Sequence, residues 1–183
     1  MDEIGTGPGE HAAMIRTFIQ KDLQYVIEAH SRIYGDEYNY DDSFAAFISE
    51  TVQTFAQTGD FTSEMLWIVE LSQRPCGSIG LTRVNETTAQ LRWFLLEPEA
   101  RGAGWGRKLL EHVIAYANQQ GYRLILLWTN QSLLGARRLY ESYGFEVKEI
   151  RTQILSGQEL TEERWELALD LKQLQEQDLR RKV

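Results

Sequence analysis

Three glycines crowd into one short segment of the chain, between an apolar stretch and an amphipathic one. The segment LLEPEARGAGWGRKLLEHVIAY contains Gly102, Gly104 and Gly106. One glycine is enough to turn most corners, so this alternating run indicates a backbone that another group must approach closely. Where a loop leads into a helix, unpaired N–H groups and the positive end of the helix dipole point the same way. The segment is therefore predicted to bind an anion.

Two common nucleotide-binding loops do not fit this spacing. A Walker loop ends in Gly-Lys-Ser or Gly-Lys-Thr, but Lys108 is preceded by Arg107 and followed by Leu109. A dinucleotide fingerprint needs a third glycine at position 107 or 109, and neither position has one. The remaining pattern is Arg-x-x-Gly-x-Gly, which begins at Arg101.

This pattern, preceded by FLLEP, resembles the first signature of the GNAT superfamily of acyl-CoA N-acyltransferases. A second stretch, TNQSLLGARRLYESYGF, is similar to that family's Ala-x-x-Leu-Tyr-x-x-x-Gly-Phe and follows in the right order. The resemblance covers residues 22–171. The segments RIYGDEYNYDDSFAAFI, LWT, ARRLY and WEL are also similar to the acetyltransferase half of bacterial MarR–GNAT fusion proteins, without their winged-helix DNA-binding half.

The resemblance implies a cofactor site for acetyl-CoA, with no metal. The coenzyme A diphosphate would lie on the loop amides, and pantetheine would lie along the backbone of the preceding strand. Arginines beside the loop would add positive charge, which is favoured over the alternative of ordinary solvated residues, and the strand side chains could simply pack in the core. The cofactor-binding residues so implied are Phe94, Leu95, Leu96, Arg101, Gly102, Ala103, Gly104, Trp105, Gly106, Arg107, Leu133 and Tyr140.

Tyr140 matches the tyrosine that in many GNAT relatives donates toward the cofactor sulfur, and it is the expected catalytic residue. At ordinary pKa values, proton transfer from a tyrosine to a thiolate goes uphill by about 2 kcal/mol, so the hydroxyl could act by hydrogen bonding alone. The opposing interpretation is a packed aromatic on a helix face. A strand N–H near Leu95 or Leu96 is the expected oxyanion donor.

One position departs from the family pattern. Leu133 lies seven residues before Tyr140, where many members have an asparagine that contacts the cofactor. One polar contact is therefore expected to be missing. Asn130 could compensate, or it could cap the next helix.

The expected acceptor cleft is walled by the first two helices and the stretch YGDEYNY between them. Tyr34, Glu37 and Tyr38 are the predicted substrate-binding residues, and the tyrosines could equally be packing residues. No general base is assigned. In the expected fold, Glu37 and Glu97 could reach the acceptor amine. His30 falls on the apolar stripe of its helix, where a histidine is more often packed than catalytic.

Hydrophobic periodicity predicts the elements that position these groups. Two leading helices, the second capped by Asp42 or Ser43, precede an antiparallel meander of MLWIVEL, CGSIGLTRV and TAQLRWFLL. A helix ending at Gly121 then leads to RLILLWT, which should pair in parallel with the last meander strand. A helix over residues 132–143 follows, and the strands FEVKEIR and RWELALDL flank a turn-rich LSGQELTEE.

These elements predict an α+β (mixed α/β) fold, GNAT-like, with a central mixed, mostly antiparallel sheet of about six to seven strands flanked by about four helices. With 183 residues, 43% of them hydrophobic, we expect one acyltransferase domain over residues 15–172. A flexible leader (1–14) precedes it and a charged tail (173–183) follows. The chain has a single cysteine, Cys76, which excludes an intramolecular disulfide.

Charge and hydropathy narrow the expected partners and location. The net charge of -8 disfavours nucleic acid and could attract a cationic amine. No run of about 18 apolar residues and no signal peptide is evident, so a cytoplasmic protein without a membrane partner is expected. Dimers are common among similar folds, and a homodimer is one expected state.

The leading functional hypothesis is an N-acetyltransferase. It would move an acetyl group from acetyl-CoA to a primary amine of a small molecule or peptide by direct attack. The alternatives are an acyl-CoA-binding sensor or interaction module without turnover, and a structural domain without a ligand. The retained Tyr140 argues against the sensor.

Overall fold

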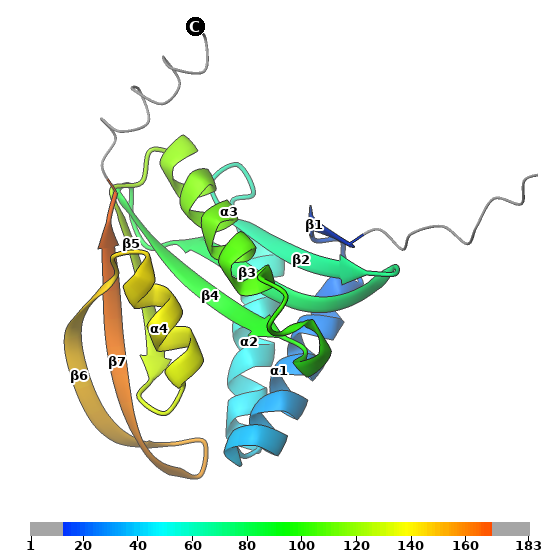
Figure 1. The fold of residues 1–183 in the computed structure, drawn as a ribbon, viewed down its shortest axis with the longest axis vertical. Coiled ribbons are helices and arrows are strands. Elements are labelled where there is room, and N and C mark those ends of the chain that lie inside the picture. Colours follow the sequence, from blue (N-terminus) through cyan, green and yellow to red (C-terminus); the bar gives the residue numbers. More distant parts are fainter. Residues whose placement is uncertain (1–12, 170–183) are drawn as a thin grey trace, which may run out of the picture.

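The computed structural model of the protein describes residues 13–169 (Figure 1). Seven strands form one sheet in the order β1-β2-β3-β4-β5-β7-β6, with α1 and α2 on one face and α3 and α4 on the other. The elements are β1 (Ala13–Thr17), α1 (Asp22–Tyr38), α2 (Asp42–Thr58), β2 (Met65–Leu71), β3 (Arg74–Arg83), β4 (Thr88–Leu96), the 3₁₀ turn η1 (Pro98–Ala100), α3 (Trp105–Gln119), β5 (Leu124–Asn130), α4 (Leu134–Ser142), β6 (Glu146–Leu155) and β7 (Gln158–Ala168).

The predicted fold class is confirmed, including the mixed sheet. Every neighbouring pair of strands is antiparallel except β4 and β5, which are parallel as expected for strands joined by a crossover helix. Their pairing covers only three residue pairs, from Thr88 with Leu124 to Gln90 with Leu126. Beyond Gln90 the two strands diverge, which Figure 1 shows as the widening gap between β4 and β5.

A β-bulge changes the direction of side chains in the second half of β4. Ser78 faces Leu95 while Gly80 faces Arg92, so three steps along β4 oppose two along β3. Trp93 lies at the bulge with φ +49°, and a Cβ added to Gly80 would lie 2.5 Å from its ring. The glycine is therefore needed for close packing, and the bulge keeps Arg92 and Trp93 on the same side of the sheet, facing α1 and α2.

The amphipathic helices bury their apolar stripes against the two faces of the sheet. On one face, α3 buries Leu109, Leu110, Val113 and Ala117 completely. On the other face, apolar side chains of α1 and α2 form a cluster with Leu66 and Ile68 of β2 and with Trp93 of β4. The two faces of the sheet thus have separate hydrophobic cores. The gap between β4 and β5 is an opening in the sheet that separates these cores.

Several predicted boundaries were wrong near the N-terminus. The strand β1 includes Ala13 and Met14, which were assigned to the leader; residues 1–12 and the tail 173–183 lie outside the described residues. The helix α1 continues through Tyr38, which places Glu37 in a helical turn rather than in a loop. The N-cap of α2 is Asp41, not Asp42 or Ser43, because the Asp41 carboxylate accepts from the Ser43 N–H at 3.0 Å.

The C-terminal hairpin also differs from the prediction. The segment expected to be turn-rich is mostly strand, and the turn is confined to Ser156 and Gly157, with φ of +53° and +79°. Two positive φ values suit a tight two-residue hairpin turn. Ion pairs such as Arg151 with Glu162, at 3.0 Å, join the charged strands across the hairpin.

Candidate active site

The three glycines of the loop before α3 serve different purposes. Gly102 and Gly104 have φ of +78° and +83°, which favour glycine, and a Cβ on either would meet no atom within 4 Å. Gly106 lies inside α3, 3.5 to 3.6 Å from neighbouring side chains at its Cβ position. The first hydrogen bond of α3 joins the Lys108 N–H to the Gly104 carbonyl at 3.1 Å. The preceding N–H groups are free of backbone acceptors one turn back and are exposed to an anion.

The two arginines expected beside the diphosphate are engaged elsewhere. Arg101 Nη2 lies 2.8 Å from the Glu37 carboxylate, and its Nε donates to the Leu96 carbonyl at 3.1 Å. The Arg107 guanidinium lies over the Tyr143 ring at 5.7 Å. Arg101 thus joins the end of α1 to the end of β4, whereas Arg107, the other of these two arginines, has no carboxylate partner among the described residues.

The open edge of β4 presents one identifiable backbone donor. The Glu97 N–H donates to the Cys76 carbonyl on β3 at 2.8 Å. Because successive N–H groups along a strand point to opposite sides, the N–H of Leu96 faces away from β3, toward the gap. The side chain of Leu95 is buried beside α1 residues, and that of Leu96 packs near Gly77 and Gly106. Core packing of the side chains therefore leaves the main chain available for a ligand.

A cavity of about 510 Å³ opens on the α1–α2 side of the gap. Seven helices and strands contribute to its wall: α1, α2, β4, β5, α4, β6 and β7. Tyr34, Phe94, Leu133 and Tyr140 line it, whereas the glycine loop does not. The predicted substrate residues Glu37 and Tyr38 do not line it either, because they lie in the last turn of α1. The size suits a small organic ligand.

Tyr140 lies where α4 meets this cavity. Its ring packs among Phe94, Phe145 and Trp165, with centroid separations of 6.2, 5.7 and 6.2 Å. Burial raises the pKa of Tyr140 well above its usual range. The hydroxyl has no hydrogen-bond partner within residues 13–169, although the residue lines the cavity. The side chain is both a core aromatic and a hydroxyl available to a ligand.

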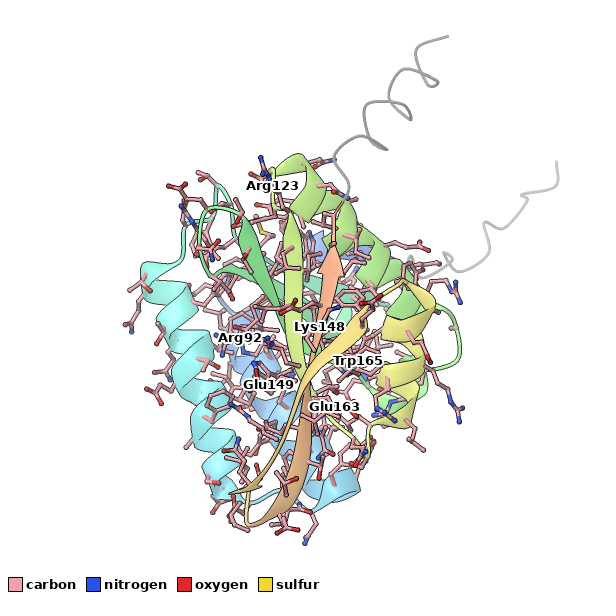
Figure 2. The ribbon with its side chains drawn as sticks, turned by 90° about the vertical axis from the view of Figure 1, so that its left-hand side faces the viewer. Arg92, Arg123, Lys148, Glu149, Glu163 and Trp165 are labelled. Carbon is pink, nitrogen blue, oxygen red and sulfur yellow. The ribbon has the colours of Figure 1, made fainter. Side chains whose placement is uncertain are left out.

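A buried ion pair fixes α4 against β7. Glu163 accepts two hydrogen bonds from the Arg137 guanidinium, at 2.8 and 3.1 Å, and a third from Trp165 Nε1 at 3.0 Å. Figure 2 labels Glu163 and Trp165 on β7. Because Trp165 also packs against Tyr140, this network orients the tyrosine ring.

His30 is buried, as its place on the helical stripe predicted, but it also lines the cavity. Its Nδ1 lies 2.7 Å from the Val26 carbonyl, so Nδ1 carries the proton and Nε2 is the acceptor. Burial lowers the pKa of His30 to about 4. The ring is therefore neutral near pH 7, and its Nε2 has no protein partner among the residues described.

Arginines hold both glutamates that were considered as the general base. Glu97 is buried and lies 2.6 Å from Arg32, and Tyr25 also donates to it at 3.4 Å. Glu37 pairs with Arg101. Neither glutamate lines the cavity.

Both polar atoms of the Asn130 side-chain amide form hydrogen bonds within the protein. Its oxygen accepts from the Ser132 N–H at 2.8 Å, and its nitrogen donates to the Tyr40 hydroxyl at 2.7 Å. It does not cap α4, whose N-cap is Leu133 without a side-chain hydrogen bond. Asn130 thus holds the loop before α4 against the connection between α1 and α2.

Sequence reasoning missed several residues of the cavity wall. Arg92 reaches the cavity only because of the bulge at Trp93, and no local sequence pattern predicts that bulge. Arg151 and Glu162 come from the C-terminal hairpin, part of which was expected to be turn. Their charges were visible in the sequence, but their meeting point depends on strand register.

Residues 13–169 contain neither a cluster of metal-binding side chains nor a membrane-spanning helix. No cluster of three or more His, Cys, Asp or Glu side chains there could hold a metal ion. None of the helices in that range is long and apolar enough to cross a membrane.

Comparison with known proteins identifies the family. The sequence profile of the acetyltransferase (GNAT) family matches residues 23–145, more than half of the chain. The chain belongs to this family. An uncharacterised N-acetyltransferase of Methanocaldococcus jannaschii is 26% identical over 74% of this chain and 62% of its own length. Human N-acetyltransferase 8B is 32% identical over 44% of this chain. The alignment spans only 37% of that human protein.

Solved GNAT structures share the fold. An acetyltransferase from Streptococcus agalactiae has a TM-score of 0.72 at 20% identity and covers 86% of this chain and 98% of its own. A GNAT family acetyltransferase from Elizabethkingia anophelis, solved with acetyl-CoA bound, has a TM-score of 0.60 at 20% identity, over 86% of this chain and 98% of its own.

Proposed function

We propose that this protein is an N-acetyltransferase that moves the acetyl group of acetyl-CoA to a primary amine of a small molecule or peptide by direct attack. The observation that carries the proposal is the gap beyond Gln90, where β4 loses its parallel partner. In this proposal the gap connects the helix start that is predicted to bind an anion with a cavity large enough for an acceptor. Family membership and the acetyl-CoA complex of the Elizabethkingia relative support the choice of cofactor.

Acetyl-CoA would supply an activated thioester. The free N–H groups between Gly102 and Arg107 and the dipole of α3 would hold its diphosphate. The unpaired edge of β4 would hold the pantetheine through its main chain. Both contacts use backbone groups, so they depend on loop and strand geometry more than on side-chain identity.

The chemical step needs three further groups. The amine nitrogen attacks the thioester carbon, a C–N bond forms and the C–S bond breaks; coenzyme A leaves as the thiolate, water takes up the proton that the nitrogen loses, and water protonates the released sulfur. The Leu96 N–H would donate to the carbonyl oxygen as charge develops there. The Tyr140 hydroxyl would donate a hydrogen bond to the departing sulfur, without full proton transfer, because its raised pKa makes that transfer more unfavourable. His30 Nε2 would accept a hydrogen bond from the amine and orient it.

Release of free thiol from acetyl-CoA in the presence of a panel of primary amines tests the proposal. We expect at least one amine to accelerate thiol release and an N-acetylated product to be found by mass spectrometry. Coenzyme A binding by calorimetry without turnover for any amine would instead support the sensor hypothesis. Absence of both binding and turnover would contradict both functions.

The finer expectations from the sequence remain proposals. A homodimer is supported by β6, an edge strand with Ile150 and Ile154 exposed by 61% and 73%. Analytical ultracentrifugation of the wild type and of Ile154→Lys tests this, and a monomeric wild type would contradict it. The cytoplasmic location can be tested by cell fractionation. The likeness to the acetyltransferase half of MarR–GNAT fusions also stays a prediction.

A further inference from the structure

Arg92 carries a charge on the cavity wall without an acidic partner. The bulge at Trp93 turns it toward α1 and α2, and its guanidinium carbon lies 5.0 Å from the centroid of the Trp93 ring. In Figure 2, Arg92 lies between α2 and β5. Burial lowers its pKa, and no nearby carboxylate offsets this effect. Within residues 13–169, none of the ion pairs involves Arg92.

The other charges on the cavity wall compensate one another. Arg151 Nε lies 3.0 Å from a carboxylate oxygen of Glu162, and the Gln153 amide donates to the same oxygen. The histidine and three tyrosines of the wall are neutral near pH 7, because burial lowers the pKa of the histidine and raises those of the tyrosines. The cavity therefore has one uncompensated positive charge, that of Arg92, although the whole chain carries a net charge of -8.

A second hollow on the other side of Arg92 does not supply the missing partner. Glu50, Asp60 and Glu64 line that hollow together with Arg83. None of these acids lies within 4.0 Å of an Arg92 nitrogen. Arg83 lines only the second hollow, which makes it a matched control for Arg92.

A partly buried guanidinium without a counter-charge is costly to the protein alone, and a carboxylate matches its planar fork with two parallel hydrogen bonds. We infer that the acceptor amine carries a carboxylate, which Arg92 binds, while the aromatic side chains of the wall cover its apolar part. This inference rests on the proposed acetyl transfer and names the chemical class of its acceptor. Phe44, Phe47 and Trp128 provide apolar surface for the rest of such a molecule.

Matched pairs of amines that differ only in carboxylate or carboxamide test the inference. The probes are phenylalanine, β-alanine and 6-aminohexanoic acid, each with its own amide, so that the distance from amine to carboxylate varies. Rates are expressed per unprotonated amine, which removes the difference in amine pKa. In the pair that the enzyme uses best, kcat/KM for the acid should exceed that for the amide by at least about tenfold, mainly through KM.

Substitutions separate a role of Arg92 from a general effect on the cavity. Arg92→Gln should lower kcat/KM of the acid toward that of the amide, whose own kcat/KM should fall much less because a neutral carboxamide forms a weaker hydrogen bond with a guanidinium. Arg92→Lys should retain part of the preference, because it keeps the charge but not the fork. Arg83→Gln should retain the full preference. Calorimetric titration with the N-acetylated acid of the best pair, which should bind the wild type and lose about tenfold in affinity in Arg92→Gln, measures the same contact without turnover.

The outcomes distinguish this inference from the proposed function. Equal use of acid and amide by the wild type, or an equal loss for both in Arg92→Gln, would overturn the carboxylate assignment while acetyl transfer stands. If no amine is acetylated and coenzyme A does not bind, the proposed function is wrong and the inference falls with it.

Discussion

The glycine loop and the acceptor cavity are built in opposite ways. The loop takes its chemistry from the backbone of consecutive residues, 101–107, at the start of one helix. The cavity takes its chemistry from side chains of seven helices and strands that lie as far apart in the chain as His30 and Glu162. The loop can therefore suit the same cofactor throughout a family, whereas the cavity can change its acceptor by single substitutions.

The sharpest test of this contrast is a loop variant that keeps every side chain of the cavity. Gly104→Val places a β-branched residue at φ +83°, which should displace the N–H groups before α3. We expect the affinity for coenzyme A to fall at least about a hundredfold by calorimetry, because several backbone hydrogen bonds are lost together.

Gly121→Val is the matched control for this variant. Gly121 follows the other end of α3, has φ +80° and is equally open to solvent. Gly121→Val should strain the backbone and lower the melting temperature about as much as Gly104→Val does, yet it should retain coenzyme A binding. Equal loss of binding in both variants would show that strain in α3, rather than loop geometry, controls the affinity.

The same contrast explains what the sequence could predict. The loop, the strands β2 and β4 and the parallel partner β5 follow from local patterns of glycine and apolar residues, and the structure has them. The cavity wall could not be predicted from such local patterns. The bulge at Trp93 depends on pairing with Gly80, a contact across strands. The strand around Glu163 has a polar sequence, and its pairing with two neighbours overrides its low intrinsic preference for strand.

On the cavity side, His30 should make stability depend on pH. Burial lowers its pKa from an ordinary 6.5 to about 4, so between these values the unfolded chain binds a proton that the folded protein does not. Its contribution to the free energy of unfolding is fully present above about pH 6.5 and is lost as the pH falls toward 4. The loss amounts to about 3 kcal/mol and can be measured by urea denaturation at pH 7.5 and 4.5.

A non-titrating variant isolates this effect. His30→Asn keeps an amide donor near the Val26 carbonyl and should lose less stability between the two pH values than the wild type. Burial also lowers the pKa of His112 on α3, but this residue is exposed whereas His30 is buried, so His112→Asn should reduce the loss less than His30→Asn does. A wild-type loss no greater than that of His30→Asn would show that the histidine stays as easily protonated in the folded protein as in the unfolded chain.

Tyr140 lies where the two regions meet, and its role should be smaller than that of the loop. Tyr140→Phe removes one hydrogen-bond donor to the departing sulfur, so kcat should fall about 10- to 100-fold with KM within about threefold. The hydroxyl has no protein partner in the described residues, so the melting temperature should stay unchanged. Tyr143→Phe is the control, because Tyr143 lies on the same helical segment but donates to Glu111 outside the cavity. An unchanged kcat in Tyr140→Phe would reduce Tyr140 to a packing residue.

Arg101 should show the smallest effect, although it stands first in the motif. Its guanidinium is held by Glu37 and by the Leu96 carbonyl, away from the loop amides. Arg101→Gln should therefore weaken coenzyme A binding less than about threefold and cost at most about 1 kcal/mol of stability, as expected for an exposed ion pair. Arg107→Gln should weaken binding more, since Arg107 has no carboxylate partner among the described residues. The reverse order by calorimetry would mean that Arg101 leaves Glu37 when the diphosphate binds, and that the loop, like the cavity, depends on a distant side chain.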